Sequence, residues 1–306
     1  MGLFNRERKA QASKEELAPQ GARELAHPRR QLTVGGLADA LLKDFPASDA
    51  EEWDRTGLLV GERDVPLAGV AIALDATVPA IREAAAAGAN VLLTHHPAYL
   101  DPPTAFAPEE SVALSPGAGV WAAIQHKVAL MDFHTALDVS PLASQVLPAL
   151  LGFKAQGAVV VPSGGAKAKG KGYGRLCAVP GGSDGPETLA HVAARCTSAF
   201  GRAPRVWGSF DAPVRTAVCA TGSAGNVVGA SLAAGADCLV CGEVRYHQAL
   251  DAFLAGLAIV ELGHDASELP LCAVLADACV RAGVPQERIV MLDQGRNWAY
   301  PEAIRL

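Results

Sequence analysis

The fold is decided by residues 86–97, which read AAGANVLLTHHP. The alanines close a segment with helical spacing, and Gly88 is the residue type that ends a helix, because glycine adopts a left-handed backbone without strain. The apolar run at 90–94 is short enough for a buried strand. Two histidines, His95 and His96, stand at its carboxyl end. This order indicates a parallel α/β unit.

The same junction recurs at residues 233–240, which read AAGADCLV. Other short apolar runs alternate with helical patterns on both sides of it. Buried strands are expected at 70–74, 128–133, 216–220, 237–241, 257–262 and 288–291. We predict an α/β fold made of two related α/β halves with mostly parallel sheets. The alternative is that any helix–glycine–strand junction reads in this way.

These patterns divide the chain into four parts. Residues 1–31 are charged and lack periodicity, so we expect a disordered tail. The first α/β half is expected at 32–155 and the second at 210–306. Between them, 156–209 is expected to be a linker and intermediate segment. Its run GGAKAKGKG at 164–172 lacks the Gly-Lys-Ser/Thr ending of a phosphate-binding loop, which favours a solvated linker.

Composition and charge exclude several classes of protein. Half of the 306 residues are hydrophobic, which is enough for a substantial core. The net charge of -6 gives no electrostatic reason to bind nucleic acid or an anionic membrane. No secretory signal or apolar run long enough to span a bilayer is present. We therefore expect a cytoplasmic protein with a small-molecule substrate, and no nucleic-acid or membrane partner.

The seven cysteines do not follow the spacing of a disulfide scaffold. Most lie in apolar runs, which predicts reduced core residues. Cys238 and Cys241 form a Cys-x-x-Cys pair, but no second pair completes a zinc site. We expect these two residues to belong to the core as well.

Polar side chains gather where the predicted strands end. His95 and His96 follow one strand, and HTALD at 134–138 follows the next. In the second half, GEVRYH at 242–247 and HDASE at 264–268 stand in the same position. Sites in α/β sheets form beyond the carboxyl ends of the strands, so we expect these residues to converge.

The residue types at these strand ends are those that bind transition metals. Imidazole and carboxylate together favour zinc, iron, manganese or cobalt over calcium or Cu(I). His134 and Asp138 are four residues apart, as are His264 and Glu268, which places each pair on one face of a helical turn. Asp138 and Glu268 are the candidates to bridge two cations, between which a water would become a nucleophile at neutral pH.

Each residue also has a simpler explanation. A single histidine is more often a surface or core residue, His134 can cap a helix, and Glu268 can be a solvated helix residue. Their joint occurrence at strand ends favours the metal site over these separate explanations. Asp54 is interpreted as a residue that orients a ligand. No role is expected for the other histidines His27, His126 and His191.

These motifs, taken in order, resemble those of a known family. WDRTGLLVG at 53–61, LTHHP at 93–97 and the three later strand-end segments are similar to the successive motifs of the Nif-three-like dinuclear-metal-centre family. Members of that family are known as GTP cyclohydrolase I type 2 homologues. The resemblance covers roughly residues 32–295. It implies a dinuclear metal site between two α/β halves, assembled as a homohexamer.

The resemblance also implies roles for single residues. The implied metal ligands are His95, His96, Asp138, His264 and Glu268. His134 and His247 would line the site as non-ligand or proton-transfer groups. Asp265 stands where the family commonly has an aromatic residue or histidine, and Arg55-Thr56 and Glu243 also depart from the family's pattern. These departures leave the implied ligands intact but can alter the substrate pocket.

Two functions stay open from the sequence. The leading hypothesis is a metal-dependent hydrolase that holds two divalent transition-metal ions and acts on a small polar or nucleotide-like substrate. The alternative is a non-catalytic metal-binding protein, such as a metal chaperone or an assembly platform, which needs no open coordination position. DNA binding by a ring-shaped oligomer is disfavoured by the acidic charge.

Overall fold

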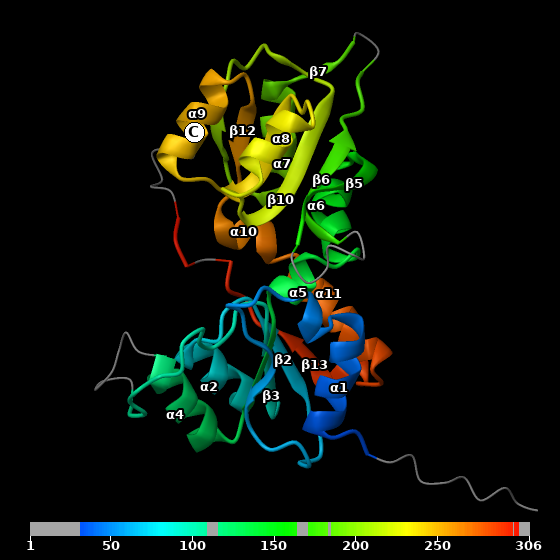
Figure 1. Cartoon of the computed structure of the whole chain (residues 1–306). Helices are drawn as coiled ribbons and strands as arrows, with labels where there is room; N and C mark the ends of the chain where they lie inside the picture. The colour runs from blue at the N-terminus through cyan, green and yellow to red at the C-terminus, as the bar shows by residue number, and fades with distance from the viewer. Residues whose placement is uncertain (1–30, 109–115, 164–170, 183–184, 296, 300–306) are drawn as a thin grey trace, which may run out of the picture. The chain divides into compact units, whose positions relative to one another are not determined.

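The computed structural model describes two β-sheets covered by helices, and a two-stranded ribbon of β7 (Glu187–Thr188) and β9 (Pro213–Val214) (Figure 1). The described residues are 31–108, 116–163, 171–182, 185–295 and 297–299. The predicted tail, apart from residue 31, and residues 164–170 of the predicted linker lie outside them.

The first sheet consists of five described strands, with two helices on each face. Its elements are α1 (Val34–Asp44), β1 (Thr56–Val60), β2 (Val70–Ala73), α2 (Val78–Ala86), β3 (Val91–Thr94), α4 (Pro116–His126), β4 (Ala129–Phe133), α11 (Leu271–Arg281) and β13 (Ile289–Met291). The strand order is β1-β4-β3-β2-β13, and every pairing except the antiparallel β1–β4 is parallel. Helices α1 and α11 cover one face, and α2 and α4 cover the other (Figure 1).

The second sheet has six described strands and mixed pairing. Its elements are α6 (Ala143–Leu151), β5 (Lys154–Pro162), β6 (Gly172–Ala178), α7 (Leu189–Phe200), β8 (Arg205–Trp207), β10 (Thr216–Ser223), α8 (Val228–Ala233), β11 (Cys238–Glu243), α9 (Tyr246–Leu254) and β12 (Ala258–Glu261). The order is β5-β6-β10-β11-β12-β8. Only β10–β11 and β11–β12 are parallel among these pairings, so the prediction of mostly parallel sheets is wrong here. Antiparallel neighbours such as β5 and β6 need no helical crossover, so a pattern of alternating strands and helices does not predict them.

The two helix–glycine–strand junctions are confirmed. Gly88 and Gly235 have φ angles of 77° and 69°, in the left-handed region that favours glycine. At each junction a backbone N–H after the glycine reaches back to the helix, from Ala89 to Ala84 O at 3.0 Å and from Ala236 to Ser231 O at 3.1 Å. These bonds satisfy carbonyls at the helix end and direct the chain into the next buried strand.

The chain changes sheets twice, at two short helices that follow β4 and β12. After α5 (Thr135–Asp138), helix α6 packs into the core of the second sheet with Leu147 and Leu151. After α10 (His264–Glu268), helix α11 returns to the core of the first sheet, and β13 pairs with β2. Two turns, η1 (Ala47–Asp49) and η3 (Gln286–Arg288), complete the described elements.

The sheets therefore do not follow the expected boundaries. Strands β5 and β6 belong to the second sheet although 156–209 was expected to be a linker and intermediate segment. Helix α11 and β13 belong to the first sheet although 210–306 was expected to form the second half. The physical reason is that apolar periodicity predicts a strand or helix but not the sheet on which it packs.

The seven cysteines are free and buried, as predicted. Cys238 and Cys241 lie in the cores on opposite faces of the second sheet, because side chains alternate along a strand, so they do not form a paired site. Among the described residues, no helix has the length and apolar character to cross a membrane.

Candidate metal centre

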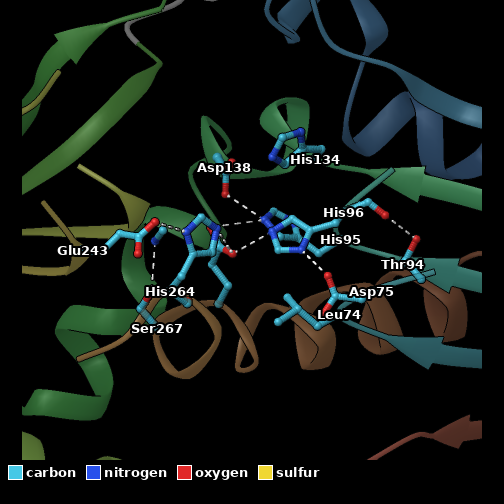
Figure 2. Close-up of polar contacts among 12 residues, drawn as sticks. Leu74, Asp75, Thr94, His95, His96, His134, Asp138, Glu243, His264 and Ser267 are labelled. Atoms are coloured by element: carbon cyan, nitrogen blue, oxygen red, sulfur yellow. Dashed lines mark hydrogen bonds and ion pairs between the residues drawn. The ribbon is translucent and has the colours of Figure 1, made fainter. Parts of the chain in front are cut away.

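Three strand ends supply the side chains of the candidate metal centre (Figure 2). His95 and His96 follow β3, Asp138 ends α5 after β4, and His264 and Glu268 begin and end α10 after β12. Their nitrogen and oxygen atoms form overlapping groups within which ligand atoms lie no more than 4.8 Å apart. The structure thus brings together all five residues that the sequence predicted as ligands.

Glu268 is the carboxylate on which three of the histidines converge. Its Oε2 lies 2.9 Å from His96 Nε2 and 3.1 Å from His264 Nε2, and its Oε1 lies 3.6 Å from His95 Nε2. Gly222, at the end of β10, permits this position because a side chain there would overlap the Glu268 carboxylate. Glu268 is nearly fully buried, so its carboxylate is held in place rather than solvated.

His95 and Asp138 leave polar atoms without a hydrogen bond. His95 is fully buried, and its Nε2 lies 3.5 Å from Asp138 Oδ1. Neither atom has a hydrogen-bond partner among the described residues. Buried polar atoms are normally paired, so two unpaired ligand-type atoms that face each other fit a cation between them.

The tautomer of His95 is fixed by the backbone. His95 Nδ1 lies 3.2 Å from the carbonyl oxygen of Phe133. A carbonyl only accepts hydrogen bonds, so Nδ1 donates and Nε2 is the nitrogen that faces the interior of the site. In proteins, metal-binding histidines are oriented by such a hydrogen-bond acceptor on the nitrogen that faces away from the metal, which we call the outer partner.

His96 and His264 are oriented in the same way by carboxylates. His96 Nδ1 donates to Asp75 Oδ1 at 2.8 Å, and His264 Nδ1 donates to Glu243 Oε1 at 2.9 Å. Each Nε2 is then directed at Glu268. Carboxylate partners fix the ring and increase the basicity of the inner nitrogen.

Asp75 and its support were missed from the sequence. Gln294 Oε1 accepts from the backbone N–H groups of Leu74 and Asp75, both at 2.8 Å, and so fixes the turn after β2. Asp75 follows a buried strand, so the rule that found the other residues applied to it as well. Gln294 gave no comparable signal, because it comes from the segment after β13.

The charges of the site are coupled. Burial favours the neutral form of Glu268, but the positive charge of His95 and contacts with His264 and His96 hold the pKa of Glu268 well below its ordinary value. Burial lowers the pKa of His96, yet its bonds to Asp75 and Glu268 raise that pKa to about 10. His96 therefore carries a proton on Nε2 as well as on Nδ1, and a metal ion must displace the Nε2 proton to bind.

His134 lies at the edge of the centre and is held by Asp54. Its Nδ1 donates to Asp54 Oδ1 at 2.9 Å, while Asp54 Oδ2 accepts from the backbone N–H of Thr135 at 2.9 Å and from the Thr135 hydroxyl. The interpretation of Asp54 as an orienting residue agrees with these contacts. The His134 ring lies 5.3 Å from that of His95, and one of its nitrogens belongs to a group with His95 and His96.

His247 is not brought into this cluster. It is exposed near the start of α9, and its ring contacts Tyr246 at a centroid distance of 5.3 Å. It belongs to none of the ligand groups and is absent from the described lining of the adjoining cavity. The spacing GEVRYH placed it near a strand end but could not show which side of the helix it occupies.

Asp265 also faces away from the ligands. Its carboxylate forms two bonds to Arg202, at 2.8 and 3.1 Å, and the Trp298 indole N–H donates to it at 3.4 Å. Asp265, one of the departures from the family's pattern, therefore binds Arg202 and Trp298 on the side of α10 that faces away from the ligands. It does not line the cavity next to the centre.

A cavity of about 630 Å³ adjoins the centre. His134, Asp138, His264 and Glu268 line it, together with residues from β6, α6, the turn after β10 and the start of α9. Its size lies within the range of small-molecule sites. The centre is thus open to a molecule larger than water.

The fold and this cluster define an α/β protein whose strand ends converge on a candidate metal centre. The family model of Duf34/NIF3 (NGG1p interacting factor 3) matches residues 32–292. A GTP cyclohydrolase 1 type 2 homolog of Streptomyces coelicolor is 32% identical over 250 residues, which are 80% of this chain and 83% of that protein. The chain therefore belongs to the Duf34/NIF3 family.

Further relatives agree in fold. A GTP cyclohydrolase 1 type 2 homolog of Clostridium acetobutylicum is 25% identical over 77% of this chain and 85% of its own length. The crystal structure of a Staphylococcus aureus hypothetical protein matches 89% of this chain and 100% of its own, with a TM-score of 0.76 and 23% identity. A Bacillus cereus protein related to NIF3 matches 88% and 98%, with a TM-score of 0.75 and 20% identity. At these identities the two structures support the fold alone.

Proposed function

We propose that this protein is a metal-dependent hydrolase that holds two divalent transition-metal ions, of zinc, iron, manganese or cobalt. The observation that carries the proposal is the shared orientation of the site histidines. His95, His96 and His264 each have Nδ1 bound to an outer acceptor and Nε2 directed at Asp138 or Glu268. Histidines of a purely structural cluster have no need of this common orientation.

Five side chains would hold the ions. They are His95, His96, Asp138, His264 and Glu268. Three neutral imidazoles and two carboxylates suit divalent transition metals better than calcium or magnesium, which prefer oxygen ligands. When bound, such ions would supply Lewis acidity that polarises a substrate and lowers the pKa of water.

His134 is the proposed proton-transfer group. It lines the cavity beside Asp138, and Asp54 fixes its Nδ1–H so that Nε2 faces away from that bond. A histidine held in one tautomer by a buried carboxylate accepts and returns a proton at its free nitrogen. Because the structure leaves His247 outside the cluster, the proposal gives His247 no part in this step.

The cavity favours catalysis over metal storage. A storage or chaperone site needs closed coordination, whereas Asp138, His264 and Glu268 border a space large enough for a small molecule. The name of the relatives supports a hydrolase that acts on a small polar or nucleotide-like substrate. A homohexameric assembly and a cytoplasmic location are further parts of the proposal.

The test is a substrate screen with the metal-loaded protein and an Asp138→Ala variant. Hydrolysis of a nucleotide-like substrate should be abolished in the variant while its circular dichroism and melting temperature match the wild type. Asp211→Ala, which removes an exposed acid on the loop before β9, serves as the matched control. Turnover that survives Asp138→Ala would sink the hydrolase proposal.

A further inference from the structure

The cavity beside the metal centre has two chemically different walls. One, the closed wall, comes from the segment before β1, from α6 and from β6, and includes Glu51, Trp53, Ser144, Leu147 and Tyr173. The other, the open wall, comes from β10, the turn after it and the start of α9, and its polar side chains are Thr221, Ser223, Asn226, Arg245 and Gln248. The metal-centre residues border both walls.

The polar groups of the closed wall are bonded within the protein. The Tyr173 hydroxyl donates to Glu51 Oε1 at 3.0 Å, and Ser144 Oγ accepts from Arg175 at 2.7 Å. A ligand can therefore contact this wall mainly through the apolar surfaces of Leu147 and the Trp53 ring. Trp53 is 56% exposed, and its ring centroid lies 5.8 Å from that of His134. An exposed indole beside a reactive centre is suited to hold a flat ring.

The open wall carries five polar side chains that are available to a ligand. None of its five side chains has a hydrogen bond or ion pair with another described residue. Arg245 is the cation among them, at the residue before α9 and two residues after Glu243. A guanidinium at this place presents paired donors to a carboxylate or phosphate.

The metal centre adds to the same charge preference. If two divalent ions bind, their four positive charges exceed the two negative charges of the proposed ligands Asp138 and Glu268, while the carboxylates of Asp75 and Glu243 contact the far nitrogens of His96 and His264. This step rests on the proposed function. The acid of the closed wall, Glu51, is already bonded to Tyr173, so it offers a ligand less negative charge than a free carboxylate would. A loaded centre and Arg245 would then both attract an anion.

We propose that the cavity binds a small organic anion with a flat ring, the ring against Trp53 and the anionic group on Arg245. The substrate's reacting group would then lie toward Asp138 and Glu268. Trp53 and Arg245 thus become specificity-determining residues, the first for the ring and the second for the charge.

The test is calorimetric binding of three naphthalene probes to the metal-loaded protein. A naphthyl phosphonate and naphthoate carry the two candidate anionic groups, and naphthyl methanol is their neutral counterpart. At least one anion should bind about tenfold more tightly than the alcohol, and the tighter anion identifies the group that Arg245 prefers. Arg245→Gln should reduce this preference several-fold without weakening the alcohol, because the metal centre still attracts the anion, and Trp53→Ala should weaken all three probes.

Arg215→Gln, which changes an exposed arginine away from the cavity, is the matched control and should keep the preference. Equal binding of anions and alcohol, or equal behaviour of Arg245→Gln and Arg215→Gln, overturns the inference. Metal content measured on the same samples separates the two proposals. An anion preference that depends on Arg245 in a protein that retains no metal would refute the metal proposal and leave the pocket assignment standing.

Discussion

The two short helices that follow β4 and β12 carry a histidine and a carboxylate at the same spacing, but these side chains make different contacts. Each has a histidine at its start, His134 directly before α5 and His264 as the first residue of α10, and a carboxylate four residues later. In α10 both side chains face the centre, with His264 Nε2 3.1 Å from Glu268. At α5, His134 is bonded outward to Asp54, and Asp138 faces His95 at 3.5 Å instead. Both histidines bond an outer carboxylate through Nδ1, so equal spacing and a similar outer contact do not fix which residue the inner nitrogen meets.

The largest effect is expected from the two carboxylates of this comparison. Glu268→Gln should weaken metal binding by more than about 100-fold, because three histidines converge on this one carboxylate and even outer partners of ligands contribute 10- to 100-fold. Asp138→Asn should weaken it less, since Asp138 faces His95 alone among the site histidines. Competition with a chromophoric chelator measures both, with the exposed Glu287→Gln as control. Equal losses in the two variants would show that the helices are equivalent after all.

Substitution of the outer partners of His264 and His134 tests which histidine binds metal and which transfers protons. Glu243→Gln should weaken metal binding about tenfold, because Glu243 orients the proposed ligand His264. Asp54→Asn should leave metal affinity nearly unchanged and lower turnover, because Asp54 orients His134. Metal affinity and the pH dependence of turnover are measured on both variants. Release of metal by Asp54→Asn would make His134 a ligand and contradict its proposed role.

Buried acids on β4 and β12 make a second contrast. Asp132 has no hydrogen-bond partner for either oxygen among the described residues, and burial together with Asp54 raises its pKa from 3.8 to about 9. Glu261 accepts from Arg205, from the Trp207 indole at 2.9 Å and from the Val244 N–H at 2.8 Å. Against the effect of burial, these contacts lower the pKa of Glu261.

The two acids should therefore affect stability in opposite pH ranges. A raised pKa means that the contribution of Asp132 is complete below about pH 3.8 and is lost as the pH rises toward about 9. Asp132→Asn should flatten this decline and stabilise the protein at pH 8 by about 1–2 kcal/mol. The contribution of Glu261 is present above its ordinary pKa and lost as the pH falls through the lowered one, so Glu261→Gln should destabilise by about 1–2 kcal/mol at neutral pH.

Urea unfolding of both variants across pH 4 to 9 measures these effects. A decline with pH that persists unchanged in Asp132→Asn would show that another group causes it. Destabilisation by Asp132→Asn at pH 8 would show that the carboxylate has a partner that the described contacts do not reveal.

The smallest effect is expected where a helix enters the next strand. Gly256, between α9 and β12, has a φ of 92°, whereas Lys127, between α4 and β4, is the described non-glycine residue with a positive φ, at 54°. Lys127→Gly should stabilise the protein by about 0.5–1 kcal/mol, because glycine adopts this backbone without strain. Gly256→Ala should destabilise it by about 1 kcal/mol. Chemical denaturation compares them, and a destabilised Lys127→Gly variant would contradict the strain argument.

Local features of the fold, such as helix ends and buried strands, could be predicted from the sequence, whereas the packing of distant elements could not. The junctions at Gly88 and Gly235 and the ends of most buried strands were predictable, because apolar period and glycine placement are local signals. The assignment of α6 to the second sheet and of α11 to the first was not, since either helix could cover either core.

The same division holds for the site. His95, His96 and Glu268 were predictable because they combine ligand chemistry with strand-end position. The outer partners Asp75 and Glu243 were not assigned, because carboxylates near strand ends are common and only geometry shows which imidazole they meet. The structure leaves His247 outside the described ligand groups, and spacing does not fix the side of a helix that a residue faces.

The central claim is that both short helices contribute to one two-metal centre, and metal stoichiometry tests it most directly. Elemental mass spectrometry should find about two equivalents of a transition metal in the wild-type protein after metal loading. A His95→Ala/Asp138→Ala variant should lose both ions, because it removes the mutually facing pair that has no other partner. A wild-type protein that retains no metal after reloading, or a double variant that keeps two equivalents, would contradict the account.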